Sequence, residues 1–218
     1  RGREPISARL IADLYKTAGA DRLMCVDLHT SQIQGFFDGP LDHLFAIPVL
    51  AEYIKSRVEN PENVTVVSPD TGRVRVAEHW ATLLGGAPLA FVHKTRDINV
   101  PNQAVSKTVV GEIEGRSCVL IDDMIDTGGT IAGAVNVLKE KGAKEVIIAA
   151  THPVFSGPAV ERLSGCGASE VVVTNTLPVP DDKRFENLTV LSIAPLVARA
   201  IREVFDEGSV TNIFNDHA

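Results

Sequence analysis

The sequence of 218 residues predicts an α/β protein in which helices flank a mostly parallel sheet. Short apolar runs rich in β-branched residues, of which 119–121 is the clearest, are typical of parallel strands buried on both faces. Segments with helical spacing of apolar residues separate these runs, which implies βαβ units. The length allows a substantial core and suits one large or two small domains.

The first predicted element is a helix from Pro5 to about Lys16, because Pro suits a first helical turn and Gly19 ends the apolar repeat. A buried strand is predicted at 23–26. No earlier segment offers a strand that could pair with it, and a lone strand leaves its edge groups without partners. We therefore expect that an amino-terminal portion of the protein precedes Arg1.

The remaining elements alternate along the chain. Helices are predicted at 47–58, 74–84, 127–141, 157–164 and 194–205, and strands at 64–68, 89–92, 117–121, 146–150, 171–174 and 189–192. The segment from His93 to Ser106 is polar with little periodicity, which predicts a long mobile loop or an open hairpin. Loops of this length are commonly functional.

Composition and charge exclude several classes of protein. A net charge of −7 argues against a broad nucleic-acid-binding face, because that affinity comes from clustered Lys and Arg. The sequence has no apolar run of about 18 residues for a membrane span and no secretory signal. Cys25, Cys118 and Cys166 are odd in number and widely spaced, as reduced core residues of a cytosolic protein are. We expect a cytoplasmic protein with no nucleic-acid or membrane partner.

The most informative stretch runs from Val119 to Ile131. Its strand leads into the carboxylates Asp122 and Asp123, which face the crevice where open α/β sheets bind ligands. Adjacent carboxylates repel each other unless hydroxyls, amides or a metal satisfy them, so a vicinal diol and Mg²⁺ are natural companions. A turn of small residues follows: Asp126, Thr127, Gly128, Gly129 and Thr130. Backbone amides at such a turn before a helix favour a bound phosphate.

Two other interpretations of this motif exist. A strand, an Asp N-cap and a glycine-relieved turn need no ligand, although the preceding acid pair argues against so plain a reading. A Walker B strand also ends in Asp-Asp, but the sequence has no Gly-x-x-x-x-Gly-Lys-Ser/Thr motif to accompany it. A sugar-phosphate site remains the favoured interpretation.

The residues from Val119 to Ile131 resemble the phosphoribosyl diphosphate-binding motif of the type I phosphoribosyltransferase fold. Three further matches occur in the order seen in ribose-phosphate diphosphokinases. They are Val26-Asp27-Leu28-His29 with Gln32 to Asp38, then Ser68-Pro69-Asp70-Thr71-Gly72, then Lys94-Thr95-Arg96. Over essentially its whole length the chain resembles the phosphoribosyl diphosphate synthetase family.

This resemblance implies two similar domains, of which the first is incomplete. Residues 1–45 would be the remainder of the amino-terminal domain and 46–192 the carboxyl-terminal phosphoribosyltransferase-like domain. Residues 193–218 would form a terminal helix and tail that pack back on the first domain, with the active site between the domains. The family carries much of its ATP-binding surface upstream of Arg1, which implies weak nucleotide binding and little or no activity for the chain alone.

The resemblance also implies roles for single residues. His29 and Asp70 would bind Mg²⁺ on the nucleotide triphosphate, although a lone His is more often structural and Asp70 could serve only a turn. Asp122 and Asp123 would hold the ribose 2- and 3-hydroxyls and their metal, and residues 126–130 the 5-phosphate. Mg²⁺ is the implied cofactor.

Lys94 and Arg96 alternate along an extended segment, so both side chains point to one face. Two cations on a loop are usually solvated surface. Opposite a phosphate-binding scaffold they would form a closing clamp that neutralises charge during phosphoryl transfer, and Arg96 would also contact ribose 5-phosphate. Arg73 stands where many relatives have a small residue, which leaves the conformation of its loop open.

The implied reaction is attack of the anomeric hydroxyl of ribose 5-phosphate on the β-phosphorus of ATP, giving 5-phosphoribosyl 1-diphosphate and AMP. The family also implies a homo-oligomer, commonly a hexamer, with phosphate and ADP as allosteric effectors. A phosphoribosyltransferase that consumes this product would share residues 119–131 but would not need the Asp-Leu-His segment. A silent regulatory paralogue is a third interpretation, which the presence of His29, Lys94 and Arg96 disfavours.

Overall fold

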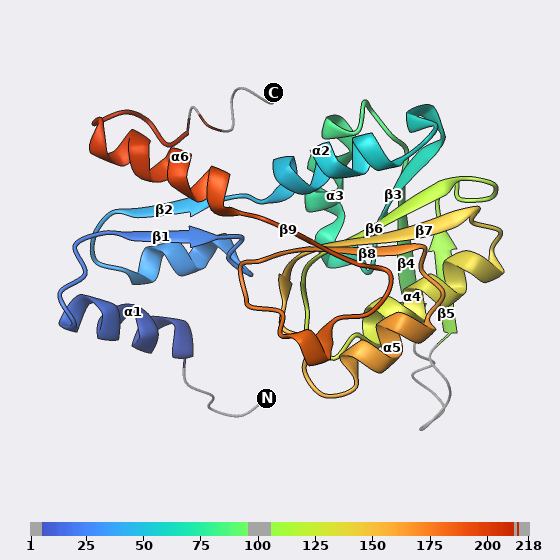
Figure 1. The fold of residues 1–218 in the computed structure, drawn as a ribbon, viewed down its shortest axis with the longest axis horizontal. Coiled ribbons are helices and arrows are strands. Elements are labelled where there is room, and N and C mark those ends of the chain that lie inside the picture. Colours follow the sequence, from blue (N-terminus) through green and yellow to red (C-terminus); the bar gives the residue numbers. More distant parts are fainter. Residues whose placement is uncertain (1–5, 96–105, 212, 214–218) are drawn as a thin grey trace.

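The computed structural model describes residues 6–95, 106–211 and 213 of the chain. Figure 1 shows a small sheet beside a large one. The small sheet pairs β1 (Leu23–Val26) with β2 (Leu41–Leu44) in parallel. The large sheet has seven strands in the order β5-β4-β3-β6-β7-β8-β9, and every pair in it is parallel except β4 with β5. The predicted α/β fold with a mostly parallel sheet is confirmed.

The elements of the described chain have the following bounds. The strands of the large sheet are β3 (Val64–Ser68), β4 (Leu89–Thr95), β5 (Ser106–Val110), β6 (Ser117–Ile125), β7 (Glu145–Pro153), β8 (Glu170–Thr174) and β9 (Leu188–Leu191). The α-helices are α1 (Ser7–Thr17), α2 (Ile47–Arg57), α3 (Val74–Leu83), α4 (Gly129–Glu140), α5 (Ala159–Gly165) and α6 (Ala194–Phe205). Among the described residues, none of these helices has the length and apolar character that crossing a membrane requires.

Two hydrophobic clusters cover the two faces of the large sheet. Successive residues of β6 alternate between them: Val119 and Ile121 pack with α2 and α3, whereas Leu120 packs with α4 and α5. Figure 1 shows these helix pairs on opposite sides of the sheet. Because both faces are covered, the central strands carry apolar residues at every position, the pattern from which the sheet was predicted.

The first cluster also joins the two sheets. Leu44 of β2 is fully buried in it, and Leu196 and Ala200 of α6 belong to the same cluster. Met24 and Val26 of β1 pack against the same cluster. The small sheet and α6 therefore share a core with the large sheet.

The structure extends or adds strands where polar residues obscured the pattern. The predicted strand 117–121 continues to Ile125, because β6 keeps pairing with β7 as far as the partners Ile125 and Pro153. Asp122 and Asp123 thus lie within β6. Strand β5 was not predicted; it pairs antiparallel with β4 from Phe91 opposite Val110, so the described flanks of the 93–106 segment form a hairpin. Residues 96–105 lie outside the described chain.

Strand 23–26 does not stand alone, so this prediction is wrong. It pairs with β2, from Leu23 opposite Leu41 to Val26 opposite Leu44. The sequence Leu41-Asp42-His43-Leu44 was not predicted as a strand, because two polar residues interrupt its apolar pattern. The first helix begins at Ser7, and Pro5, which was expected in its first turn, lies outside the described residues.

Candidate active site

A cavity of about 350 Å³ lies where β6 ends and α4 begins. It gathers residues from the turn after β1, from the segment after β3 and from β6 and α4. The predicted site residues that line it are His29, Asp70, Asp122, Asp123, Asp126, Thr127, Gly128, Gly129 and Thr130. Parallel strands bring these sequence-distant segments to one edge of the sheet, as predicted.

The glycine-rich turn forms the α4 end of this cavity. Gly128 has φ +72°, a left-handed conformation that favours glycine, and α4 begins at the next residue. Within the described structure no side chain caps this helix start, so its first N–H groups are available to an anion. The carbonyl of Thr127 accepts a hydrogen bond from Arg162 Nη1 at 2.9 Å, which braces the turn from α5.

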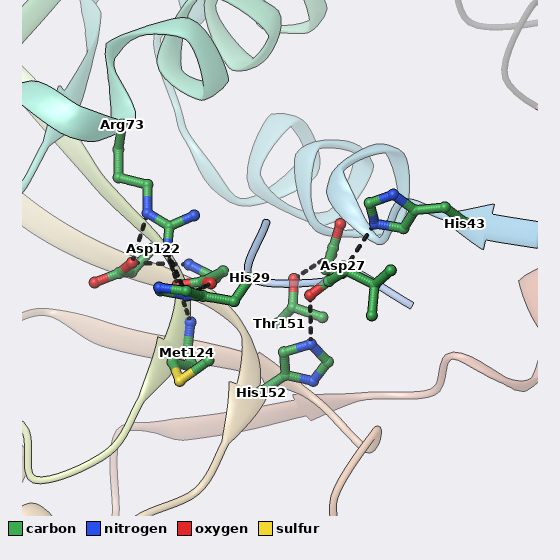
Figure 2. A network of polar contacts seen from close by, with 10 residues as sticks. Asp27, His29, His43, Arg73, Asp122, Met124, Thr151 and His152 are labelled. Atoms are coloured by element: carbon green, nitrogen blue, oxygen red, sulfur yellow. Dashed lines mark hydrogen bonds and ion pairs between the residues drawn. The ribbon is translucent and has the colours of Figure 1, made fainter. Parts of the chain in front are cut away.

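Asp122 and Asp123 are held in place by the backbone and by Arg73. The amide of Asp123 donates to Asp122 Oδ1, and the amide of Met124 donates to Asp123 Oδ1, both at 2.9 Å. Arg73 Nη2 lies 2.6 Å from Asp123 Oδ1, and its Nε lies 3.7 Å from Asp122 Oδ1. Figure 2 shows the guanidinium directed at the acid pair. The pair is therefore partly charge-compensated by the protein itself.

The two carboxyl groups differ in acidity. Burial raises the pKa of Asp122 to about 7, and the hydrogen bond and negative charge of Asp123 act in the same direction. Burial alone would also raise the pKa of Asp123, but hydrogen bonds with Asp122 and His29 and the charge of Arg73 outweigh it and lower this pKa. Asp123 is the carboxylate that stays charged, while Asp122 readily holds a proton near neutral pH.

His29 contacts the acid pair from the turn after β1. Its Nδ1 lies 2.7 Å from Asp123 Oδ2 and 3.0 Å from Arg73 Nη2 (Figure 2). A neutral Nδ1 cannot accept from Arg73 and donate to Asp123 at once, and donation to the carboxylate is the stronger interaction. With the proton on Nδ1, Nε2 carries the lone pair. Nε2 is therefore the atom through which His29 could bind a metal ion.

Asp70 lies two residues after the end of β3. Its Oδ1 accepts a hydrogen bond from the amide of Gly72 at 2.9 Å and so caps a single 3₁₀ turn, Thr71–Arg73. The turn role considered from the sequence is thus real. The side chain is exposed and lines the same cavity as His29, so one carboxylate can serve both the turn and a ligand.

The residues around this cavity fit one kind of metal site. Among the described residues, no three His, Cys, Asp or Glu side chains form a group able to hold a metal ion. Mg²⁺ in phosphoryl-transfer sites usually keeps several waters and binds through one or two carboxylates together with substrate phosphates. Asp70 and the acid pair supply such carboxylates at one cavity. They fit a Mg²⁺ that arrives with a phosphorylated substrate.

Asp27 fixes the turn that carries His29. Its backbone has φ +43°, and its carboxylate accepts from Thr151 Oγ1 at 2.6 Å and from the amide of Ala46 at 3.1 Å. His152 Nε2 donates to the carbonyl of Asp27 at 3.1 Å (Figure 2). Burial raises the pKa of this carboxyl, while the hydrogen bonds from Thr151 and Ala46 oppose the shift. Asp27 therefore ties the small sheet to β7 two residues before His29.

The two predicted loop cations remain untested. Lys94 lies in β4, where its backbone pairs with Lys107, but its side chain is not among those described. Arg96 lies outside the described residues. The structure thus brings together the other predicted site residues without these two.

Sequence reasoning missed the structural roles of Arg73, Asp27, Thr151 and His152. Arg73 was noticed only as a departure from small residues in relatives, and Asp27 only as part of a motif. A half-buried Asp with positive φ has no signature in a single sequence, because neither burial nor φ can be read from residue type.

A mostly parallel sheet whose central strand carries an acid pair before a glycine-rich turn defines the class of this protein, the type I phosphoribosyltransferase-like α/β fold. The family described as phosphoribosyl synthetase-associated domain matches residues 87–215. Relatives of known name extend the match to the whole chain, which belongs to the ribose-phosphate pyrophosphokinase family.

Two relatives and one crystal structure document this membership. The ribose-phosphate pyrophosphokinase of Bifidobacterium longum is 65% identical over 218 residues, covering 100% of this chain and 64% of the relative. That of Mycobacterium bovis is 67% identical over the same length, covering 100% and 67%. The crystal structure of phosphoribosylpyrophosphate synthetase from Mycobacterium smegmatis is 65% identical, covers 95% of this chain and 66% of its own, and has a TM-score of 0.87. The chain spans about two thirds of the length of these relatives.

Proposed function

We propose that the chain forms the ribose 5-phosphate-binding part of a ribose-phosphate diphosphokinase. This enzyme transfers the diphosphoryl group of ATP to the 1-hydroxyl of ribose 5-phosphate, giving 5-phosphoribosyl 1-diphosphate and AMP. The observation that carries the proposal is the single cavity lined by the acid pair, the glycine-rich turn, His29 and Asp70. The names of relatives 65–67% identical over the full chain support the same reaction.

The sugar phosphate would bind along the cavity from β6 to α4. The 5-phosphate would accept hydrogen bonds from the N–H groups of residues 126–130, where the helix dipole contributes about 0.3–2 kcal/mol. The ribose 2- and 3-hydroxyls would donate to Asp122 and Asp123, which lie half-buried within β6. This placement orients the 1-hydroxyl toward the side of the cavity that holds His29 and Asp70.

ATP would be held on that second side. Mg²⁺, when bound there, neutralises triphosphate charge, and His29 and Asp70 are the residues that would hold it. Asp27 and Asp123 fix the position of His29 through the turn backbone and through Nδ1. Lys94 and Arg96 are proposed to meet the charge that develops on the transferred group, because phosphoryl transfer depends mainly on positioning and electrostatic stabilisation.

We also propose a domain division, an oligomeric state and a location for the protein. Residues 1–45 would belong to one domain and 46–192 to a second, with 193–218 returning to the first; the pairing of β1 with β2 in a sheet separate from the large one supports this division. The family resemblance supports a homo-oligomer, commonly a hexamer, with phosphate and ADP as effectors. It also supports a cytoplasmic location.

A coupled assay tests the reaction. Two proteins are assayed: the 218-residue chain and the product of the gene's full reading frame. Each is incubated with ATP, ribose 5-phosphate and Mg²⁺, and the formation of AMP is followed. We expect AMP from the product of the full reading frame. Asp123→Asn should lower its rate of AMP formation at least about a hundredfold, because the amide would lose the charge-assisted hydrogen bonds proposed with the ribose hydroxyls. Consumption of phosphoribosyl diphosphate with a free base, and no AMP from ATP, would instead identify a phosphoribosyltransferase.

A further inference from the structure

Arg73 lies between two cavities. It lines the 350 Å³ cavity and also a neighbouring one of about 450 Å³, whose walls are formed largely by α2 and α3. The Arg73 side chain is only 19% exposed. It reaches Asp123, Asp122 and His29 together, as Figure 2 shows.

These contacts use up much of the acceptor capacity of Asp123. Its Oδ1 already accepts from the amide of Met124 and from Arg73, and its Oδ2 contacts His29. A carboxylate oxygen has about two lone-pair sites. A ligand that approaches Oδ1 must therefore take the place of Arg73, because the amide of Met124 is fixed within β6.

Charge gives the same answer. Once both Asp122 and Asp123 are ionised, they need a counter-charge, which either a cationic side chain or a divalent cation can supply. Arg73 and a bound cation within a few ångströms of the same oxygens would repel each other. The guanidinium extends from the last residue of the short turn Thr71–Arg73, so its side chain can leave without movement of β6.

We propose that Arg73 is a resident counter-ion of the acid pair, which a divalent cation must displace before it can bind Asp122 and Asp123. The cation affinity of the free protein is then held low, and Arg73 is released toward the phosphate groups that arrive with the cation. This inference rests on the proposed function only for the identity of the cation and the substrate.

Direct titration with Mn²⁺, a spectroscopic stand-in for Mg²⁺, tests the inference. Binding to the full chain is measured by electron paramagnetic resonance without ATP or ribose 5-phosphate. We expect Arg73→Ala to bind Mn²⁺ roughly tenfold more tightly than the unsubstituted protein, which corresponds to the loss of one charge-assisted hydrogen bond. Arg73→Lys keeps the charge without the planar fork and should fall between the two.

Arg75 provides the matched control. It is an exposed arginine two residues further on, lines the neighbouring cavity, and in the described structure forms no ion pair with Asp122 or Asp123. Arg75→Ala should leave Mn²⁺ affinity unchanged. Circular dichroism checks that each variant is folded. If Arg73→Ala does not fold, Arg73→Gln takes its place.

The outcomes separate this inference from the proposed reaction. Tighter Mn²⁺ binding by Arg73→Ala supports the counter-ion role whether or not AMP is formed in the coupled assay. Equal or weaker binding overturns it even if the enzyme makes phosphoribosyl diphosphate. An equal gain in Arg75→Ala also overturns it, because the effect would then reflect net charge alone.

Discussion

At the scale of single residues, the site depends on half-buried polar groups that several hydrogen bonds hold in place. Asp27 is the clearest case, since three hydrogen bonds from Ala46, Thr151 and His152 hold its carboxylate and carbonyl. Such an arrangement fixes the turn before His29 more firmly than apolar packing would, because each hydrogen bond is directional. The stability of the turn and the orientation of the His29 side chain are thus linked.

Replacing Asp27 with Ala should lower the free energy of unfolding by about 2–4 kcal/mol. The substitution leaves the donors of Thr151 and Ala46 without a partner, and alanine tolerates the positive φ of this position less well than aspartate does; both effects are costly. Urea denaturation followed by circular dichroism measures the change. Asp38→Ala, at an exposed position, is the control and should change stability by less than about 0.5 kcal/mol.

The thiol of Cys118 should be inert in the native protein at pH 8. Burial raises its pKa to about 12, so roughly one thiol in ten thousand is ionised at this pH, against about one in ten at the ordinary value of 9.0. The thiolate fraction grows as pH rises toward 12, and reactivity grows with it. Alkylation by iodoacetamide followed by mass spectrometry measures this. Rapid modification before denaturant is added would contradict the assignment of Cys118 to the core.

At the scale of elements, strands and helices with a covered face were predictable and those set by tertiary contact were not. The run of β-branched residues in β3 and β6 predicts a strand because both faces are apolar. Strand β2 has polar residues at its two central positions and exists because β1 lies beside it. The same holds for the site. The turn 126–130 was predictable from the sequence, whereas the contact of Arg73 with the acid pair forms only in the folded chain.

Gly128→Ala should weaken binding of ribose 5-phosphate while leaving the rest of the fold intact. An alanine at φ +72° costs about 1–2 kcal/mol, and relief of that strain would rotate the amides at the start of α4. We expect roughly tenfold weaker binding by isothermal titration calorimetry, the equivalent of that energy. Gly165→Ala in α5, where an added β-carbon meets nothing within 4 Å, is the control. Unchanged affinity in Gly128→Ala would argue against phosphate binding at this turn.

At the scale of the whole molecule, the site lies where two sheets share one core. His29 lies on the turn after β1 of the small sheet, and the acid pair lies in β6 of the large sheet. Figure 2 shows His29 beside Asp122. The contact between His29 and Asp123 exists only while the sheets keep their relation, which the shared cluster and Asp27 maintain. Packing far from the cavity therefore determines whether the parts of the site meet.

Leu44 provides a test of this shared core. It is fully buried in β2 and packs in the cluster that also contains residues of α2, α6 and β6. Leu44→Ala should lower the free energy of unfolding by about 2–5 kcal/mol, through lost burial and the cavity that remains. Leu14→Ala on α1 is the control, since Leu14 is 54% exposed and its truncation should cost less than about 0.5 kcal/mol.

The location of the effect is more informative than its size. If the two sheets unfold as one unit, Leu44→Ala should lower amide hydrogen-exchange protection in β6 and β7 by the same free energy as in β1 and β2. Loss of protection confined to β1 and β2 would mean that the small sheet opens alone, separating His29 from Asp123 while the large sheet stays folded. In that case the shared cluster would not couple the sheets, and the Asp27 hydrogen bonds alone would hold the site together.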